Sequence, residues 1–256
     1  MISLKNVHKS FDDHVVLDNI STEMLDGQCN MIIGQSGSGK TVLMKSIIGL
    51  HSIDSGRIEY DGRNLPEMKE KEIIMLRREV GMLFQGAALF DSETVLSNVM
   101  YPLEMFSSMT RKEMEDRAKF CLSRVNILPV AYNLMPAEIS GGMQKRVAIA
   151  RAIAMNPKYL FCDEPNSGLD PKTSLVIDQL IHEITEEYKI CTVINSHDMN
   201  SILEIGDHIV FLKDSCMVWE GTKDNVYSET NADLNDFVFA TDLFREVKSY
   251  ISKNRK

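Results

Sequence analysis

The amino-acid sequence predicts an α/β protein with a strand-rich first part, a sheet core and a helical insertion. An apolar strand at residues 29–33 runs directly into a glycine-rich loop and then into a helix. Further apolar strands at 159–162 and 192–195 alternate with helical patterns, which is typical of parallel sheets covered on both faces. Between these regions, residues 86–156 carry mainly helical periodicity. We therefore expect one α/β core that a helical segment interrupts.

The first part of the chain, about residues 1–85, is predicted to contain strands and turns followed by one helix. Apolar residues favour strands at 2–7, 15–17 and 20–24. After the glycine-rich loop, apolar side chains at positions 43, 47 and 48 share one helical face. The dipeptide Asp61-Gly62 stands between two short runs with strand character and indicates a hairpin turn.

The insertion is predicted to hold helices with recognisable ends. Thr110-Arg111-Lys112-Glu113 is a capping-box pattern, and apolar residues line one face of the helix that follows it. Another helix is expected to begin at Ser140 and to end at Asn156-Pro157, because the residue before a proline is biased away from helical conformation. The middle of the chain is therefore a helical subdomain.

Strands and helices alternate again after Pro157. We expect strands at 159–162 and 192–195, a helix at 175–184, and a terminal hairpin from 209–212 and 217–219. A last helix is expected from about residue 231, where apolar residues keep helical spacing at Leu234, Phe237, Val238, Phe244, Val247 and Ile251. This tail either packs on its own domain or docks on a partner subunit, and the sequence leaves both hypotheses open.

The composition limits the classes of protein to which the chain can belong. The chain has 256 residues, 44% hydrophobic and 25% charged, and a formal net charge of −9. This acidic balance argues against nucleic acid as the main partner, because binding a phosphate backbone requires clustered Lys and Arg. No apolar run approaches the roughly 18 residues that span a bilayer, and no signal-peptide pattern is visible. We expect a protein of the cytosol or of the cytosolic side of a membrane.

The glycine-rich loop has the sequence Gly34-Gln35-Ser36-Gly37-Ser38-Gly39-Lys40-Thr41. It fits the phosphate-loop pattern G-x-x-x-x-G-K-[ST], and it lies between a strand and a helix as that pattern requires. The glycines let backbone N–H groups approach phosphate oxygens, and the positive end of the helix adds to the attraction. Lys40 offers a charge to the β and γ phosphates, and Thr41 offers a hydroxyl to Mg²⁺. The loop predicts a nucleoside triphosphate as ligand.

A pair of carboxylates, Asp163 and Glu164, follows four apolar residues at the end of a predicted strand. Adjacent carboxylates repel each other, so a bound cation makes the pair less costly. We expect Asp163 to hold Mg²⁺, directly or through water, and Glu164 to position and deprotonate the attacking water. The alternative is a surface Asp-Glu pair at a turn, which the phosphate loop makes the weaker interpretation.

A second anion site is predicted at Ser140-Gly141-Gly142. Ser140 can cap the following helix, and the glycines leave its N–H groups open to an anion. Taken alone, such a sequence at a helix start is usually only a cap. Because one triphosphate cannot easily contact both sites within one chain, we expect a head-to-tail dimer. Each ATP then lies between the phosphate loop of one copy and Ser140–Gly142 of the other.

The ordered set of these motifs resembles the nucleotide-binding domain of ABC transporters over about residues 1–225. In chain order the set is Gly34–Thr41, Gln85, Ser140–Gly142, Asp163-Glu164, Ser167–Asp170 and His197. The resemblance implies a P-loop NTPase fold of ABC type, with a mixed sheet core, an N-terminal antiparallel β-subdomain and a helical subdomain at about 86–156. Residues 226–256 are then a C-terminal helical extension. The implied activity is that of an ATPase, which converts ATP and water to ADP and phosphate.

The resemblance also implies a role for each matching residue. Glu164, His197 and Gln85 are the implied catalytic residues, and His197 would contact the γ-phosphate. Thr41, Gln85 and Asp163 would hold Mg²⁺. Ser167–Asp170 resembles the loop at the dimer seam, and Phe11 resembles the aromatic residue that stacks on adenine. The implied ATP contacts are Phe11, Gly34, Gln35, Ser36, Gly37, Ser38, Gly39, Lys40, Thr41, Val42, Ser140, Gly141, Gly142 and Met143.

Several positions depart from the commonest family pattern. Ile139 and Met143 replace the usual leucine and glutamine around Ser-Gly-Gly, and Gly168 replaces the usual alanine. Phe11 replaces tyrosine, which keeps the aromatic ring and loses a hydroxyl. None of these changes removes a group that the chemistry requires, although the methionine puts the polar contacts of position 143 in question.

A narrower resemblance rests on the stretch from Phe84-Gln85-Gly86-Ala87-Ala88 to Pro102-Leu103, taken with Met143. This stretch is similar to the ATPases of MCE-type lipid transporters, the Mla phospholipid systems of bacterial envelopes. The resemblance implies a homodimer, peripheral on the cytoplasmic face of the inner membrane, with integral membrane permease subunits docking near residues 85–105. It also suggests a small regulatory subunit. The alternatives are the ATPase of a small-solute ABC importer and a soluble ABC ATPase outside transport.

Overall fold

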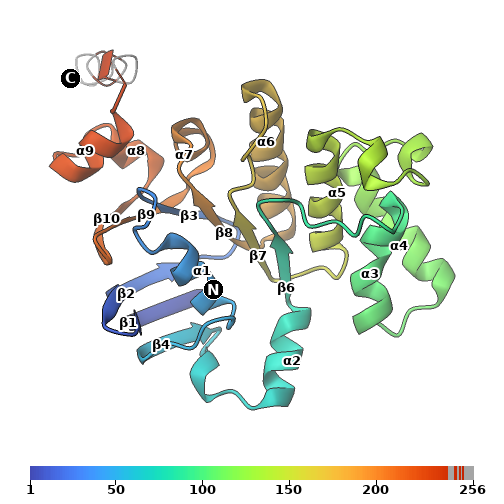
Figure 1. The fold of residues 1–256 in the computed structure, drawn as a ribbon, viewed down its shortest axis with the longest axis horizontal. Helices are drawn as coiled ribbons and strands as arrows, with labels where there is room; N and C mark the ends of the chain where they lie inside the picture. The colour runs from blue at the N-terminus through green and yellow to red at the C-terminus, as the bar shows by residue number, and fades with distance from the viewer. Residues whose placement is uncertain (242–244, 247, 249, 251–256) are drawn as a thin grey trace. The chain divides into compact units, whose positions relative to one another are not determined.

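Two compact units make up the chain (Figure 1). The computed structural model describes residues 1–241, 245, 246, 248 and 250. The first unit contains Met1–Leu25, Cys29–Glu67 and the described residues from Asn195 onward, and the second contains Asp26–Gln28 and Met68–Ile194. Strands and helices alternate through both, so the predicted α/β fold class is confirmed.

The first unit holds an antiparallel sheet made by the N-terminal strands. Its order is β2 (His14–Met24), β1 (Ile2–Phe11), β4 (Ser55–Tyr60) and β5 (Arg63–Asn64). The predicted turn at Asp61-Gly62 joins β4 to β5, and the two residues have φ angles of 48° and 79°. A two-residue turn with positive φ at both positions matches the twist of the strands that it connects. The N-terminal strand predictions are therefore confirmed as one antiparallel sheet.

A mixed set of strands in the first unit carries the glycine-rich loop. Strand β3 (Cys29–Ile33) pairs in parallel with β9 (His208–Lys213), and β9 pairs antiparallel with β10 (Cys216–Gly221). All five residues of β3 are buried, as expected of a strand that is covered on both faces. The loop then leads into α1 (Lys40–Ile47), which buries the predicted apolar positions Leu43 and Ile47, whereas Ile48 is the C-cap and is half-buried.

The rest of the first unit is mostly helical and includes the start of the predicted tail. Strand β8 (Cys191–Ser196) begins in the second unit, and its last two residues lead along the chain into α7 (Met199–Ile205) of the first. After β10 come α8 (Lys223–Val226) and α9 (Ala232–Val238).

Helix α9 packs on its own unit. Leu234 and Val238 are buried, and the ring of Phe237 stacks on that of Phe211 in β9 with centroids 5.2 Å apart. This packing agrees with the first of the two hypotheses on the tail for its described start. The other predicted apolar positions of the tail, Phe244, Val247 and Ile251, lie outside the described residues.

The second unit combines a short parallel pair of strands with the helical subdomain. Strand β6 (Val80–Leu83) pairs in parallel with β7 (Tyr159–Asp163). Helices α3 (Val95–Phe106), α4 (Arg111–Arg124) and α5 (Gly141–Ile153) pack against one another, and α5 also contacts α6 (Pro171–Tyr188). Helix α6 has 18 residues. In the part of the chain that the structure describes, no helix combines the length and the apolar character needed to cross a bilayer.

Some helix boundaries differ from those predicted, each for a physical reason. The capping box at Thr110 is present, because Glu113 accepts a hydrogen bond from the backbone of Thr110 at 2.6 Å. Helix α6 begins before its predicted start, because Asp170 caps it and proline at residue 171 suits a first helical position. The sequence did not predict α2 (Glu70–Arg78), whose only buried residue is Leu76. A helix with so little apolar face leaves a weak periodic pattern.

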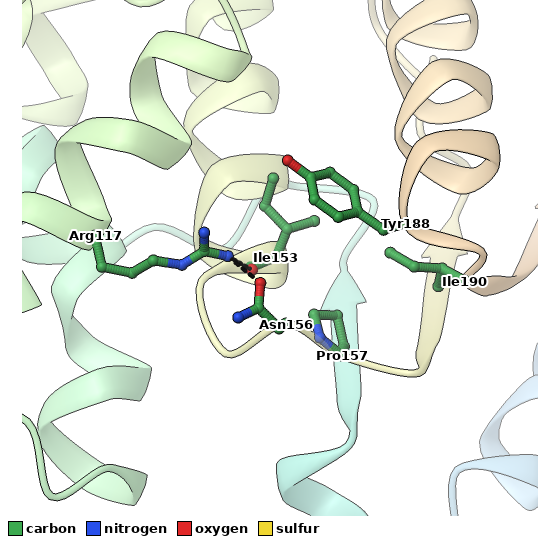
Figure 2. Close-up of a pocket in the computed structure, with 6 residues that line it drawn as sticks. All are labelled: Arg117, Ile153, Asn156, Pro157, Tyr188 and Ile190. Atoms are coloured by element: carbon green, nitrogen blue, oxygen red, sulfur yellow. Dashed lines mark hydrogen bonds between the residues drawn. The ribbon is translucent and has the colours of Figure 1, made fainter.

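Arg117 of α4 holds the C-terminal end of α5 (Figure 2). Its guanidinium donates hydrogen bonds to the carbonyl oxygens of Ile153 at 2.9 Å and Ala154 at 3.0 Å, and to the side-chain oxygen of Asn156. The last carbonyls of a helix lack partners within it and attract positive charge. The small pocket in Figure 2, about 140 Å³, lies at this junction and is also lined by Pro157, Tyr188 and Ile190. Arg117 therefore joins two helices of the subdomain.

Replacing Arg117 with methionine is expected to destabilise the protein by about 2 kcal/mol, because partly buried carbonyls lose charge-assisted donors. Urea unfolding followed by circular dichroism measures the change. Arg111→Met is the matched control, since Arg111 lies on the same helix with a side chain that is 82% exposed. Equal stability of the two variants would contradict the role of Arg117.

Candidate functional site

The glycine-rich loop of the first unit has a backbone that only glycine fits at two positions. Gly34 has a φ of 151° and Gly39 a φ of 99°. A Cβ atom on Gly34 would lie 2.3 Å from the carbonyl oxygen of Leu212, and one on Gly39 would lie 2.7 Å from that of Val16. Both contacts are too close for any side chain. The predicted glycine pattern therefore reflects close packing of the loop against neighbouring backbone.

Lys40 is buried at the start of α1 and folds back onto the loop. Its Nζ donates hydrogen bonds to the carbonyl oxygens of Gly34 at 2.7 Å and Gln35 at 2.9 Å. The buried Oγ of Ser38 has no hydrogen-bond partner among the described residues, and a buried hydroxyl without a partner carries a free-energy cost. The first turn of α1 contains no acidic side chain. An ammonium, an unpaired hydroxyl and an open helix N-terminus together suit a phosphate group.

The other loop positions lie at the surface. Gln35, Ser36, Gly37 and Thr41 are exposed, and Val42 is half-buried.

Phe11, at the end of β1, is 41% exposed. Its ring meets that of His51 edge-on with centroids 5.5 Å apart, and the Nζ of Lys9 lies 5.1 Å from the ring centre. An aromatic ring on the surface of the unit can stack on a planar ligand.

Helix α9 lies beside this loop. A polar pocket of about 330 Å³ is lined by Gln35 to Ser38 on one side and by Asp233 and Asp236 of α9 on another. Asp233 also forms an ion pair with Lys213 of β9. No local sequence pattern predicts this neighbour, because the tail is nearly two hundred residues from the loop along the chain.

The acidic pair of the second unit lies where β7 ends. Asp163 is the last residue of the strand, and Glu164 has a φ of 48°. A non-glycine residue in this left-handed region costs about 1 kcal/mol or more, and such strain persists where the surrounding structure holds it. The backbone of Ser167 donates to the carbonyl oxygen of Glu164 at 3.1 Å, and the buried side chain of Asn166 donates to Asp178 at 2.8 Å. A tight, anchored turn therefore holds Glu164 in place.

Gln85 follows β6 and reaches this turn. Its Nε2 donates a hydrogen bond to the Oγ of Ser167 at 3.1 Å, so Oε1 is the amide atom left to accept or to ligate. The backbone carbonyl of Gln85 accepts a hydrogen bond from the Nζ of Lys145 on α5. The structure thus brings together Gln85, Ser167 and Lys145.

Sequence reasoning missed Lys145. It is only 5% exposed, although the polar run Gln144-Lys145-Arg146 shows no sign of which side chain is buried. Burial lowers the pKa of Lys145, and the nearby Cys162, Asp163 and Glu164 act in the opposite direction. Helical phase relative to the apolar positions of α5 is the signal that could have found it.

The two glycines at the start of α5 have different surroundings. Ser140 caps the helix, and its Oγ accepts a hydrogen bond from the backbone of Met143 at 3.3 Å. A Cβ atom on Gly141 would meet nothing within 4 Å, whereas one on Gly142 would lie 2.7 Å from the side chain of Thr173. Gly142 is therefore explained by close packing on α6. Gly141 leaves the positive end of the helix accessible to an anion.

His197 lies in the first unit, just after β8. The backbone of Asp198 donates to the Oγ of Ser196 at 3.0 Å, and the side chain of Asp198 caps α7. This turn leaves His197 exposed. The predicted site residues are thus shared between the units: Phe11, the phosphate loop and His197 belong to the first, whereas the second contains Gln85, Ser140–Met143, Asp163-Glu164 and Ser167–Asp170.

An apolar groove of about 340 Å³ lies in the second unit beside the loop that contains Gln85. Phe84, Phe90 and Tyr101 line it and are 42%, 41% and 40% exposed. Apolar side chains that gather on a surface at this exposure are typical of an interaction site. Two arginines of α2, Arg77 and Arg78, also line the groove. The groove therefore suits an apolar segment that also carries acidic groups.

Comparisons with known proteins agree with this geometry. A sequence model of the family described as "ABC transporter" matches residues 17–167, more than half of the chain. The chain is 40% identical over 230 residues to the methionine import ATP-binding protein MetN of Carboxydothermus hydrogenoformans, a match that covers 89% of this chain and 68% of that protein. It is 34% identical over 238 residues to the intermembrane phospholipid transport system ATP-binding protein MlaF of Escherichia coli, covering 93% of this chain and 88% of that protein.

A solved structure gives the same result. It is described as the dimeric post-hydrolysis state of an ATP-binding cassette bound to ADP and Pi, and it matches this chain with a TM-score of 0.78 at 33% identity. The match covers 87% of this chain and 99% of the other. The likeness therefore concerns most of the strands and helices and not only the phosphate loop.

Replacing Lys40 with alanine is expected to weaken ATP binding by at least roughly tenfold, which equals about 1.4 kcal/mol. The reason is the loss of charge-assisted hydrogen bonds to phosphate. Equilibrium titration with a fluorescent ATP analogue measures the affinity. Lys45→Ala is the matched control, because Lys45 is exposed on the last turn of the same helix. Unchanged affinity in Lys40→Ala would contradict the interpretation of the loop.

Proposed function

Because this chain belongs to the ABC transporter family and is an ATPase, we propose that it is the subunit that energises phospholipid transport in a bacterial envelope. ATP hydrolysis would drive the opening and closing of a dimer, and the dimer would move attached membrane subunits. In this proposal residues 1–225 form the ATP-binding domain, with a helical subdomain at about 86–156, and residues 226–256 form a C-terminal extension.

In this proposal the first unit supplies contacts to the adenine ring and to the phosphates of ATP. Phe11 stacks on adenine, and the loop from Gly34 to Val42 surrounds the phosphates. The support lies in the buried, unpartnered Oγ of Ser38 among the described residues and in the ammonium of Lys40, both of which a phosphate would satisfy. Backbone N–H groups of such a loop and the positive end of α1 complete the anion site.

Mg²⁺ suits the oxygen ligands that the chain offers. Thr41, Gln85 and Asp163 would hold it through a hydroxyl, an amide oxygen and a carboxylate, the ligand types that hard cations prefer. When bound, the ion neutralises charge on the phosphates. Glu164 positions the attacking water and accepts its proton, while His197 donates a hydrogen bond to the γ-phosphate. The hydrogen bond from Gln85 to Ser167 supports this assignment, because it fixes the amide orientation.

A dimer completes each ATP site in this proposal. Ser140, Gly141, Gly142 and Met143 of one copy contact the ATP held by the phosphate loop of the other. The open surroundings of Gly141 support this contact, as does the dimeric state of the solved cassette that the chain resembles. Ser167–Asp170 would lie at the seam. At position 143 the contact involves the backbone, because methionine lacks the polar groups of glutamine.

The apolar groove is the proposed docking site of an integral membrane permease subunit. A short amphipathic helix of the permease would place its apolar face on Phe84, Phe90 and Tyr101, with acidic groups near Arg77 and Arg78. This mode of binding is typical of helices that dock in hydrophobic grooves. The protein would then be peripheral on the cytoplasmic face of the inner membrane, and nucleic acid would not be a partner. A small regulatory subunit is a further expected component.

One observation carries the choice of phospholipid as substrate. Four of the residues that resemble lipid-transport ATPases line the groove, namely Phe84, Ala88, Phe90 and Pro102. A permease for lipid and one for a small solute would differ at this contact, whereas the ATP site would be alike. The relative described as the MlaF phospholipid ATPase supports the same choice.

A second candidate is the ATPase of a methionine or other small-solute importer. The observation that favours it is the higher identity, 40% against 34%, to the relative described as a methionine import protein. A soluble ABC ATPase outside transport is a third possibility, which recovery of the protein without any membrane subunit would favour.

Reconstitution separates these functions. The protein is purified with its membrane subunits from detergent-solubilised membranes and placed in proteoliposomes. We expect ATP-dependent transfer of a labelled phospholipid and no ATP-dependent uptake of labelled methionine, because the groove would select a lipid permease. Methionine uptake without lipid transfer would overturn the proposal in favour of the importer.

Glu164→Gln is expected to lower the rate of ATP hydrolysis at least about 100-fold, because a general base contributes on this scale. ATP binding should persist, so the variant should accumulate as an ATP-bound dimer in size-exclusion chromatography with light scattering. Glu186→Gln, at an exposed position on α6, is the control. Near-normal turnover in Glu164→Gln would remove Glu164 from the mechanism.

A further inference from the structure

Two basic side chains of α5 hold the loop that follows β6 by its backbone. The Nζ of Lys145 donates to the carbonyl oxygen of Gln85. The guanidinium of Arg151 donates to the carbonyl oxygens of Ala87 at 2.8 Å and Ala88 at 2.7 Å. Three carbonyls of one short loop thus accept hydrogen bonds from a single helix. We call this set of contacts the α5 clamp.

The held loop has a conformation that alanine rarely adopts. Ala87 and Ala88 have φ angles of 61° and 49°, and each left-handed residue costs about 1 kcal/mol or more. Gly86 between them and Gln85 has open space around it, since an added Cβ would meet nothing within 4 Å. The loop is therefore not shaped by crowding at that position. The donors on α5 satisfy its carbonyls, and the backbone of Ala87 donates to the carbonyl oxygen of Phe84 at 2.9 Å, so both sets of hydrogen bonds maintain its shape.

The clamp connects the groove to the catalytic loops of the second unit. Arg151 lines the groove, and its guanidinium lies 5.9 Å from the ring centre of Phe90. At the other side of the clamp, the side chain of Gln85 reaches Ser167. The same helix that carries the two cations begins at Ser140.

The ends of α5 give the helix fixed points for such a connection. Ser140 caps its start, Gly142 packs closely on α6, and Arg117 holds its end. A helix anchored in this way moves as a rigid element, and rigid elements of this kind can couple the segments that they contact.

We propose that Lys145 and Arg151 are positioning residues. Through their hydrogen bonds, a change in the occupancy of the groove would move Gln85 and the N-terminus of α5 together. This inference rests on the proposed function, because it assumes that the groove receives the permease and that Gln85 serves ATP hydrolysis. Lys145 fixes where Gln85 stands. Arg151 holds the carbonyl oxygens of Ala87 and Ala88 and also lines the groove, so a ligand in the groove that moves Arg151 would change the shape of the loop. Neither residue touches ATP.

The experiment compares variants of the full ATPase–permease complex. Lys145→Met and Arg151→Met each remove the donors and keep an apolar stem. Lys145→Arg keeps a donor and is the conservative variant. Lys119→Met is the control, because Lys119 forms an ordinary surface ion pair with Glu115 on α4. For each complex we measure kcat, KM for ATP, the unfolding midpoint, and hydrogen exchange of the loop that contains Ala87 and Ala88.

We expect the variants to differ in kcat and in hydrogen exchange of the loop but not in KM for ATP. Lys145→Met and Arg151→Met should speed hydrogen exchange in the loop and lower kcat at least about tenfold, while KM stays within about twofold, because positioning acts on the transition state and not on ATP binding. Lys145→Arg should restore most of the rate, and Lys119→Met should behave as wild type. Hydrogen exchange gives a readout that does not depend on turnover.

Two outcomes would contradict the proposed positioning role of Lys145 and Arg151. One is faster loop exchange with a normal kcat, which would separate the loop from catalysis. The other is a parallel loss of kcat and of the unfolding midpoint with no rescue by Lys145→Arg, which would make the contacts merely structural. Failure of the proposed function is distinct, because the wild-type complex itself would then fail to transfer phospholipid.

Discussion

Two loops of this protein depend on one constraint: buried or half-buried cations and backbone carbonyls that face them must satisfy each other. A buried ammonium needs acceptors, and a buried carbonyl needs a donor. In the first unit Lys40 meets both needs through Gly34 and Gln35. In the second unit Lys145 and Arg151 do the same for the loop after β6.

Three of the non-glycine residues with positive φ angles lie at or near the loop after β6 and the acidic pair. Glu164, Ala87 and Ala88 adopt left-handed backbone conformations that the surrounding hydrogen bonds maintain. Residues held in such conformations are concentrated at functional sites, where a fixed geometry is worth its energetic cost. The two kinds of residue are linked through Gln85, whose backbone is held by Lys145 and whose side chain reaches the turn at Glu164 through Ser167. A disturbance of the loop would therefore be felt at the acidic pair.

Local chemistry decided what the sequence could predict. The buried strands, the hairpin turn at Asp61-Gly62 and the capping box at Thr110 each depend on neighbouring residues, so each was visible as a pattern and is present in the structure. Helix α2 was missed because it buries a single residue. Lys145 was missed because its burial depends on how α5 packs against other segments of the second unit. The place of α9 beside the phosphate loop depends on contacts between distant segments, for which a single sequence carries no local signal.

Overall sequence identity to the two relatives does not distinguish an ATPase of a lipid transporter from one of a small-solute transporter. In the proposed function Gly34, Lys40 and Glu164 serve ATP, a ligand that lipid and small-solute transporters would share, so these residues would contribute identity without reporting the substrate. Information about the substrate can reach this chain only where another subunit touches it. In the proposed complex that place is the groove around Phe84 and Phe90, and the α5 clamp is the route by which its occupancy would alter catalysis. The few residues of the groove wall therefore carry more information about transport than the larger number that are shared.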